Sequence, residues 1–340
     1  MPKHEHANIP IFIPHLGCPN DCVFCNQRTI SGHTDFDVSG VKNEIENALS
    51  TIGERRAEIA FFGGSFTGIE RGLMIYLLDL AESYVESKRV TGIRLSTRPD
   101  YIDGEIIGIL KRYTVSEVEL GIQSTSDEVL LKSRRGHTRE QSEKACAMLV
   151  SAGIPFVGQM MIGLPSSDSE SEIRTAADIC RWGASGARVY PTVVFRRTEL
   201  CALAERGAYT PLTDEEAAKR TARVLDVFDR ENVNVIRVGL CASENLASES
   251  EVYGGANHPA IGELAMNELY FDRISAALDT VKKTGNALVL YVARGAVSKA
   301  AGQKRRNIVR ICEKYGINQV KILEKNELIG YNIELEYTSI

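Results

Sequence analysis

The feature that most constrains the fold of this chain is a repeated alternation of short apolar runs with segments of helical periodicity. The apolar runs predict six strands, at residues 9–14, 59–62, 92–96, 115–122, 156–162 and 187–195. The segments between them predict helices, at residues 38–52, 69–87, 105–113, 138–152 and 169–182. Short connections in such an order predict parallel strands joined by right-handed crossovers. Six units are too few for a closed eight-stranded barrel, so we expect an α/β fold with a partial (β/α)6 TIM-like barrel.

The remainder of the chain predicts a smaller, second unit. A helix over 214–231 with Thr213 as its N-cap and a strand over 233–238 precede residues 239–259, which are rich in Ser, Glu, Gly and Asn and predict a loop. Further elements are expected as helix, strand, helix and two strands, at residues 261–280, 287–292, 296–315, 320–323 and 329–336. Asn326 and Glu327 predict a hairpin turn between the last two strands. We therefore expect a core domain at 1–250 and a small α+β extension at 251–340.

Three cysteines, Cys18, Cys22 and Cys25, fall on the loop after the first predicted strand. Three thiolates on one short loop can hold a 4Fe-4S cluster and leave its fourth iron open. A structural zinc site needs four ligands, and His15 or His33 would have to supply the fourth, so zinc stays open as an alternative. A disulfide uses two cysteines and is rare in the cytosol.

Other polar or small residues follow the ends of later predicted strands, where sites gather in α/β folds. Gly63 and Gly64 bring backbone close to a ligand, or simply form a tight turn. Gln123 has the donor and the acceptor that a ribose diol needs, or else caps backbone. Arg98 and Arg188 are candidates to pair with an anionic group, with a surface ion pair as the alternative.

The cysteine spacing, with Phe24 just before the third cysteine, resembles the signature of the radical S-adenosylmethionine (SAM) superfamily. The resemblance implies that the open iron is chelated by the amino and carboxylate groups of SAM. It also implies that an electron from the reduced cluster cleaves SAM to a 5′-deoxyadenosyl radical, which abstracts hydrogen from a substrate.

Further motifs resemble the catalytic subunit of Elongator over residues 9 to about 245. Residues 63–66 are similar to its Gly-Gly-[Thr/Ser]-Phe motif, with Ser65 where many radical-SAM proteins have glutamate. Five more stretches resemble motifs of the same relatives: 96–100, 118–124, 132–137, 161–165 and 189–194. Oxygen-independent coproporphyrinogen oxidases share the cysteine spacing and the Gly-Ile-Gln-Ser run, so a porphyrin-handling or heme-handling relative stays an alternative.

The resemblance implies a set of site residues. Cys18, Cys22 and Cys25 are expected to hold the cluster. The expected SAM contacts are Gly63, Gly64, Ser65, Phe66, Ser96, Arg98, Gln123, Gly163 and Leu164. Cys241 and Tyr190 are candidate hydrogen donors or radical relays, with inert burial as the alternative.

Two departures limit the resemblance. The Elongator subunit spaces its first two cysteines more widely, and residues 255–340 contain no Arg/Gln-x-x-Gly-x-Gly/Ala loop of an acetyltransferase. The tail, with HPAIGEL at 258–264 and SKAAGQKRRN at 298–307, instead resembles the extension of stand-alone bacterial radical-SAM proteins. A transfer-RNA substrate is therefore an expectation by analogy only.

Charge and composition constrain the partners. The net charge is −5 over 340 residues, so RNA binding would need a local patch. Such a patch is predicted as a cationic helix face, made of Lys299, Lys304, Arg305, Arg306 and Arg310, although a solvated face is the alternative. The chain shows no signal peptide and no membrane span, and we expect a cytoplasmic enzyme. Its expected partners are SAM, an electron donor such as ferredoxin or flavodoxin, and a tRNA; an RNA-binding protein with a structural or sensor cluster is the rival.

Overall fold

The computed structural model describes residues 6–13, 16–18, 22–26, 36–53, 55–240 and 250–338. His15, His33 and Cys241, which the sequence analysis singled out, lie outside these residues. None of the helices described is both long and apolar enough to span a membrane.

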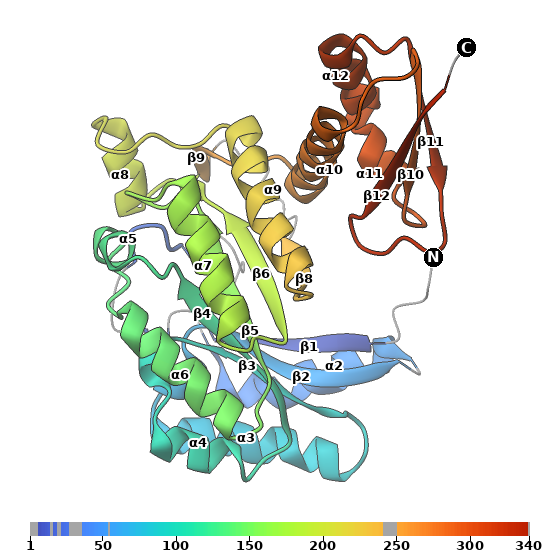
Figure 1. The fold of residues 1–340 in the computed structure, drawn as a ribbon. Coiled ribbons are helices and arrows are strands. Elements are labelled where there is room, and N and C mark those ends of the chain that lie inside the picture. Colours follow the sequence, from blue (N-terminus) through green and yellow to red (C-terminus); the bar gives the residue numbers. More distant parts are fainter. Residues whose placement is uncertain are drawn as a thin grey trace.

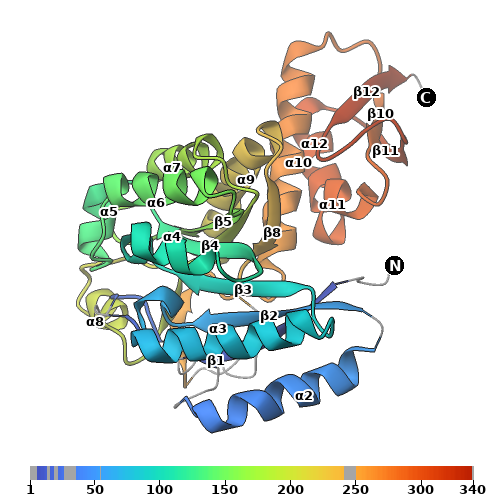
Figure 2. The same cartoon turned by 90° about the horizontal axis from the view of Figure 1, so that it is seen from below.

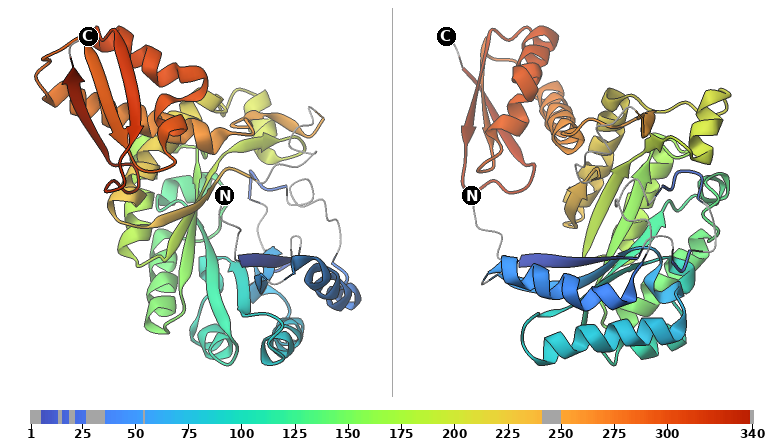
Figure 3. Two further views of the ribbon diagram at one scale, coloured as in Figure 1. Left: turned by 90° about the vertical axis from the view of Figure 1, so that its right-hand side faces the viewer. Right: turned by 180° about the vertical axis from the view of Figure 1, so that it is seen from behind.

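A sheet of seven parallel strands forms the centre of the molecule and curls into a half-barrel (Figures 1 and 3). Its strand order is β1-β2-β3-β4-β5-β6-β8, so neighbours in the chain are neighbours in the sheet. The strands are β1 (His6–Ile13), β2 (Arg56–Gly63), β3 (Gly92–Thr97), β4 (Val115–Gln123), β5 (Phe156–Ile162), β6 (Gly186–Pro191) and β8 (Asn234–Val238). The expected partial barrel is confirmed, and β8 adds a seventh strand to the six that were predicted.

The helices cover the outer face of this sheet (Figure 2). They are α2 (Val41–Ile52), α3 (Arg71–Glu86), α4 (Gly104–Leu110), α6 (Arg139–Ser151), α7 (Ser169–Arg181) and α9 (Asp214–Arg230). Side chains alternate along each strand, so one set packs beneath the helices. In β1, for example, Ile9, Ile11 and Ile13 belong to the apolar core that Val41 and Ile45 of α2 complete. The other set faces the inside of the half-barrel.

Capping residues fix where several helices begin. Thr138 accepts from the backbone of Gln141, whose side chain in turn accepts from the Thr138 amide. Thr213 forms the same capping box with Glu216 and begins α9, as predicted. A cap of this kind is worth about 1 kcal/mol.

The strand predicted over 187–195 is two strands. The chain turns at Thr192, whose hydroxyl donates to the Ile162 carbonyl at 2.6 Å. Strand β7 (Val193–Phe195) then leaves the barrel and pairs antiparallel with β9 (Val252–Gly255), inside the segment predicted as a loop. Two short helices also went unpredicted, α5 (Asp127–Lys132) and α8 (Glu199–Glu205).

The C-terminal elements form a second core beside α9 (Figure 3). They are α10 (Ile261–Thr280), β10 (Ala287–Val292), α11 (Val297–Ala301), α12 (Arg306–Tyr315), β11 (Gln319–Glu324) and β12 (Ile333–Thr338). The predicted hairpin is wrong, because β10 lies between β11 and β12 and pairs with each. The single helix predicted over 296–315 is also wrong, because positive φ angles at Gly302, Lys304 and Arg305 break it.

The half-barrel and the C-terminal unit are joined by an apolar contact between α9 and α10. Leu225 and Ala222 of α9 pack against Leu269 and Ala265 of α10 in one apolar cluster. The domain boundary at residue 250 stays a prediction.

Candidate active site

The predicted site residues gather at one edge of the half-barrel, where the parallel strands end. The loop after β1 carries the three cysteines, and we call its described residues, 16–18 and 22–26, the cysteine loop. The end of β2 and the turn after it carry Gly63–Phe66, which we call the glycine loop. Arg98 follows β3, Gln123 ends β4, and Gly163 follows β5. Parallel strand order makes these loops neighbours in space.

The cysteine loop and the glycine loop are packed backbone to backbone. The Ser65 amide donates to the Leu16 carbonyl at 3.0 Å. A Cβ atom on Gly64 would lie 2.1 Å from the Leu16 oxygen, and one on Gly17 would lie 2.2 Å from the Ser65 oxygen. Neither position can take a side chain without moving the loops apart. The contact places the Cys18 sulfur 3.5 Å from the Ser65 hydroxyl.

Phe66 anchors the glycine loop from below. Its ring is buried and stacks on Phe61 of β2, with the centroids 4.5 Å apart. The neighbouring Thr67 hydroxyl lies 2.6 Å from that of Thr97, which ends β3. Phe66 therefore supports the loop from the core, while Gly63, with φ of +103°, turns the backbone toward the edge.

The second half of the cysteine loop, residues 22–26, is hydrogen-bonded to the residue after α5 and to α8. The Val23 amide donates to the Ser133 carbonyl after α5, and the Val23 carbonyl accepts from the Leu200 amide of α8. The Cys25 amide donates to the Cys22 carbonyl at 3.0 Å in a tight turn. The two unpredicted helices thus position Cys22 and Cys25.

None of the three motif cysteines forms a disulfide with a described residue. Within the described ranges, no three Cys, His, Asp or Glu side chains are gathered closely enough to hold a metal ion, so the three sulfurs do not form a closed metal site. Their assignment as cluster ligands stays a prediction, based on the chemistry of the donors and on how their loops are packed.

Arg98 is buried behind the cysteine loop, with 1% of its surface exposed. Its Nε and Nη2 atoms donate to the two carboxylate oxygens of Asp100 at 3.0 and 2.8 Å. Burial alone lowers the pKa of Arg98, but the hydrogen bonds and charge of Asp100, with smaller contributions from Cys22 and Cys18, outweigh it and raise that pKa. The Nη1 atom is buried and has no hydrogen-bond partner among the described residues.

A second buried arginine, Arg135, contacts the cysteine loop directly. Its Nη1 donates to the Cys22 sulfur at 3.6 Å, and its Nη2 donates to the Gly121 carbonyl of β4 at 2.8 Å. His137 lies nearby, with its Nε2 atom 3.2 Å from the Ile122 carbonyl. Burial, helped by the charges of Arg135 and Arg98, lowers the pKa of His137 to about 2, so this ring is neutral at physiological pH.

Gln123 sits where β4 bulges, with φ of +65°. Its side-chain Oε1 is buried and has no partner among the residues that the structure describes, which leaves an acceptor for a ligand hydroxyl. Ser96, two residues before Arg98 on the inner face, has its hydroxyl 3.5 Å from the Phe61 carbonyl.

The turn after β5 is held rigidly from outside the barrel. The Gly163 amide donates to Glu172 of α7 at 2.7 Å, and its carbonyl accepts from the Tyr209 hydroxyl at 2.6 Å. Glu172 also pairs with Arg220 of α9. Leu164 is buried next to this turn. The arrangement fixes the backbone of 163–164 at the edge.

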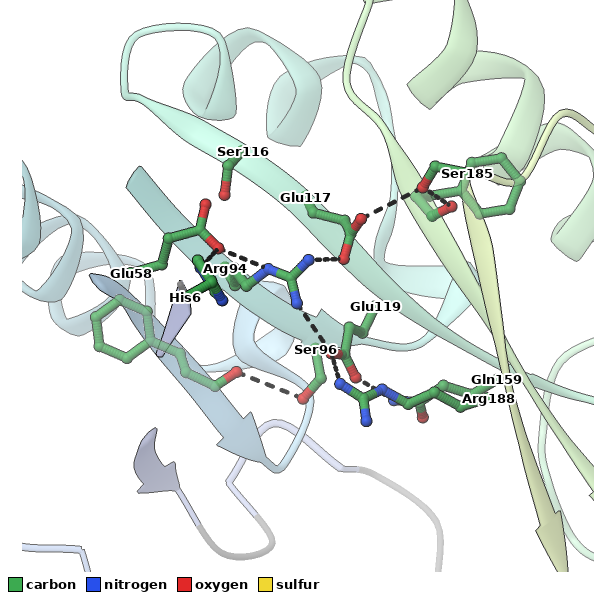
Figure 4. A network of polar contacts seen from close by, with 12 residues as sticks. His6, Glu58, Arg94, Ser96, Ser116, Glu117, Glu119, Gln159, Ser185 and Arg188 are labelled. Atoms are coloured by element: carbon green, nitrogen blue, oxygen red, sulfur yellow. Dashed lines mark hydrogen bonds and ion pairs between the residues drawn. The ribbon is translucent and has the colours of Figure 1, made fainter. Parts of the chain in front are cut away.

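The inside of the half-barrel holds a charged network that the sequence analysis missed (Figure 4). Arg94 pairs with Glu58 at 2.9 Å and with Glu117, and lies 3.9 Å from Glu119. Glu119, which is 3% exposed, also accepts from Arg188 at 2.7 Å. We call Glu58, Arg94, Glu117, Glu119 and Arg188 the inner-face network.

Arg188 therefore differs from its prediction in position and partner. It lies within β6 and not at its end, and its ion pair with Glu119 is largely buried. Burial alone lowers the pKa of Arg188, but the charge of Glu119 and contact with Tyr190 raise it overall. Tyr190 shares this face of β6 with Arg188, on the inside of the half-barrel.

The predicted cationic helix face is only partly present. Arg306 pairs with Glu215 and Arg310 with Glu268, at 2.8 and 2.7 Å. The guanidinium of Arg310 also lies 3.5 Å from the centre of the Phe271 ring. Lys304 and Arg305 are exposed at the break between α11 and α12.

Two family models match the chain. Residues 12–177 match the model described as the radical SAM superfamily, and residues 184–270 match the radical SAM C-terminal domain. These two segments include the cysteine loop and the strands of the half-barrel from β2 to β8, together with the last two residues of β1.

Two curated relatives illustrate the similarity. The chain is 33% identical over 132 residues to the tRNA uridine(34) acetyltransferase of Methanocaldococcus jannaschii, a match that covers 38% of this chain and 24% of that protein. It is 30% identical over 254 residues to Elongator complex protein 3 of Drosophila melanogaster, covering 62% and 46%. The chain thus matches less than half of the length of either relative.

A solved structure has the same fold. The Methanocaldococcus infernus Elp3 structure, with an N-terminal deletion, superimposes with a TM-score of 0.62 at 20% identity. The superposition covers 80% of this chain and 63% of that one.

Proposed function

Because the chain belongs to the radical SAM superfamily and is therefore an enzyme with a 4Fe-4S cluster and SAM as its cofactors, we propose that it acts on a substrate inside the half-barrel by radical chemistry. When bound, these cofactors supply reductive cleavage: SAM accepts one electron and yields methionine and a 5′-deoxyadenosyl radical, which removes a hydrogen atom from the substrate. The electron comes from a one-electron donor protein of the ferredoxin or flavodoxin class. A protein in which the cluster is only structural is disfavoured.

Cys18, Cys22 and Cys25 would hold the cluster. They lie at the carboxyl edge of the sheet and form no disulfide with a described residue, and Cys22 accepts a hydrogen bond from Arg135. Three thiolates match a cluster with one open iron and leave a zinc ion short of a ligand.

Residues of four further strands would hold SAM. The backbone of Gly63, Gly64 and Ser65 would receive its amino group, next to the cysteine loop. The free Oε1 of Gln123 and the hydroxyl of Ser96 would face its ribose. Gly163 and Leu164 would lie beside its adenine, on a turn that Glu172 and Tyr209 hold in place. Phe66 supports these contacts from the core.

The observation that carries the proposal is the direct packing of the cysteine loop on the glycine loop. Two glycines that leave no room for a Cβ atom bring the cluster ligands and the SAM-binding backbone together. The chain's own residues would orient both cofactors at one edge, and the cofactors would supply the reactivity.

The test is anaerobic reconstitution of the full chain with iron and sulfide, followed by incubation with SAM and dithionite. The wild type should contain about four irons and four sulfides per chain and should release 5′-deoxyadenosine. A Cys22→Ala variant should lose both properties. A Cys180→Ala variant, which removes a thiol from α7, should keep them. A wild type without iron and sulfide would refute the proposal.

We propose a tRNA as the substrate. One relative is named as a tRNA-modifying enzyme, and the sequence analysis reached the same class by analogy. Lys304 and Arg305 offer an exposed cationic point for a phosphate backbone, although Arg306 and Arg310 are engaged by carboxylates.

This proposal is tested by binding of total tRNA to the reconstituted chain at several salt concentrations. A Lys304→Ala/Arg305→Ala variant should bind more weakly and with a smaller dependence on salt, whereas Lys111→Ala/Lys144→Ala, with the same loss of charge, should not. Equal binding by all three proteins would refute this surface. A porphyrin absorption band in the purified protein would instead support the heme-handling alternative.

Cys241 and Tyr190 remain candidate hydrogen donors. Tyr190 lies on the inner face of β6, where a substrate in the half-barrel would lie, and Arg188 contacts it. A Tyr190→Phe variant that still cleaves SAM but does not form product would support that role.

A further inference from the structure

The guanidinium of Arg98 is buried, and one of its nitrogens has no hydrogen-bond acceptor among the described residues. Two of its nitrogens form a fork with Asp100, at 3.0 and 2.8 Å. The third, Nη1, is buried and has no acceptor among the described residues. A buried donor without an acceptor costs about 1–3 kcal/mol, and more when it is charged. Such an atom marks a place where an acceptor binds.

The surroundings of Arg98 indicate which acceptor this is. The thiols of Cys22 and Cys18 are close enough to influence the pKa of Arg98, and Cys22 is already hydrogen-bonded to Arg135. The guanidinium also lies 5.9 Å from the centre of the Tyr101 ring. Arg135 thus contacts Cys22 directly, the charge of Arg98 acts on the same cysteine, and Asp100 holds Arg98 in a fixed orientation.

The net charge of the residues around Arg98 is positive and favours binding of an anion. Arg98 and Arg135 carry two positive charges, and Asp100 carries one negative charge. Cysteine ligands bind metals as thiolates, so a loaded cysteine loop is anionic, and reduction adds a further electron. A fixed positive charge in a buried site favours the more negative, reduced form.

We propose that Arg98 is a positioning residue of the iron–sulfur cluster, whose third nitrogen donates to a sulfur of the loaded site and whose charge raises the reduction potential of the cluster. The inference rests on the proposed function, because it assumes that the three cysteines hold the cluster. It differs from the sequence-based expectation that Arg98 pairs with the carboxylate of SAM.

The experiment compares the full-length wild type with Arg98→Met and Arg98→Lys, each reconstituted anaerobically. Iron and sulfide content, the midpoint potential from an EPR-monitored redox titration without SAM, and the affinity for SAM are measured on each. Arg89→Met serves as control, because Arg89 pairs with Glu46 on the outer helices. It should have the midpoint of the wild type.

At equal iron content, Arg98→Met should have a more negative midpoint than the wild type. Arg98→Lys should lie between the two, because an ammonium keeps the charge but cannot both pair with Asp100 and reach the sulfur as the guanidinium fork does. If Arg98→Met does not take up the cluster, the lysine variant alone decides the result.

Wild-type midpoints in a loaded variant would overturn the inference while leaving the proposed function intact. A fall in SAM affinity at an unchanged midpoint would also overturn it and would assign Arg98 to the SAM carboxylate. A wild type that holds no cluster would instead refute the proposed function itself.

Discussion

Two groups of buried charge lie within this half-barrel, and their balance differs. In the inner-face network, three carboxylates surround Arg94 and Arg188, so the described charges sum to one negative. At the carboxyl edge, Arg98 and Arg135 lie by the cysteine loop, and Asp100 is the one carboxylate that pairs with either of them among the described residues. The sum of these three charges is one positive.

This difference in net charge indicates that the arginines of the two groups have different roles. Inside the half-barrel, each arginine pairs with carboxylates of neighbouring strands and joins strands β2 to β6 across the sheet. At the edge, Arg135 donates to a sulfur, and Nη1 of Arg98 has no acceptor among the described residues. An unpaired nitrogen also occurs in the network, at Nε of Arg188, so the two groups differ in their partners and net charge. We interpret the first group as part of the scaffold and the second as part of the binding site. The predictions below test this distinction through the free energy of unfolding, measured with urea.

The largest effect is expected in the inner-face network. Arg94→Met would remove the arginine partner of the largely buried Glu58 and Glu117, which keep only their contacts with His6 and Ser185 among the described residues. The change should lower the free energy of unfolding by about 3 kcal/mol. Arg89→Met breaks an exposed pair with Glu46 and should cost no more than about 1 kcal/mol. Equal losses in the two variants would contradict a scaffold role for the network.

An intermediate effect is expected where the two loops meet. Gly64→Ala places a Cβ atom 2.1 Å from the Leu16 oxygen, and should lower the free energy of unfolding by about 1–3 kcal/mol while reducing cluster uptake. The matched control is Gly108→Ala in α4, where a Cβ atom meets nothing within 4 Å. That change should be neutral or stabilise by up to about 1 kcal/mol. Normal cluster uptake by Gly64→Ala would show that loop contact is dispensable.

The smallest effect concerns His137 and appears only on acidification. In the folded chain its pKa is lowered from 6.5 to about 2. Below pH 6.5 the ring is therefore protonated in the unfolded chain but stays neutral in the folded chain. Stability should therefore fall as the pH falls, by about 1.4 kcal/mol between pH 7.5 and 5.5. A His137→Gln variant should lack this part of the pH dependence. The same slope in both proteins would show that the ring titrates normally.

The sequence predicted the scaffold well because its strongest signal is local. Strands such as β5 and helices such as α7 have the predicted type and nearly the predicted bounds, since β5 is a short buried run rich in apolar residues and α7 begins at a capping box. Loop positions at the strand ends followed from parallel topology alone, which brought Cys18, Gly64 and Gln123 to one edge.

The errors have tertiary causes. The local pattern predicted one strand over 187–195 and did not mark the turn at Thr192. Residues of β7 form a separate strand because β9 pairs with them from more than fifty residues away. The short helices α5 and α8 have too few turns for a periodic pattern, yet they hold the second half of the cysteine loop. The hairpin failed because β12 pairs with β10 and not with the strand before it.

The inner-face network did leave a signal that we missed. Polar residues alternate with apolar ones inside buried strands, as Arg94 and Ser96 do in β3 and Glu117 and Glu119 do in β4. That period of two places them on the face opposite the helices. Their pairing, however, depends on strand register and could be known only from the structure.

A half-barrel, unlike a closed one, ends in two rims, here β1 and β8 in the described strand order. Such rims invite strands of other molecules to attach and extend the sheet. The exposed Pro10 within β1 lacks an amide hydrogen and weakens the template that this rim would offer. We therefore expect the β1 rim to resist the strand-to-strand pairing by which sheets of separate copies join.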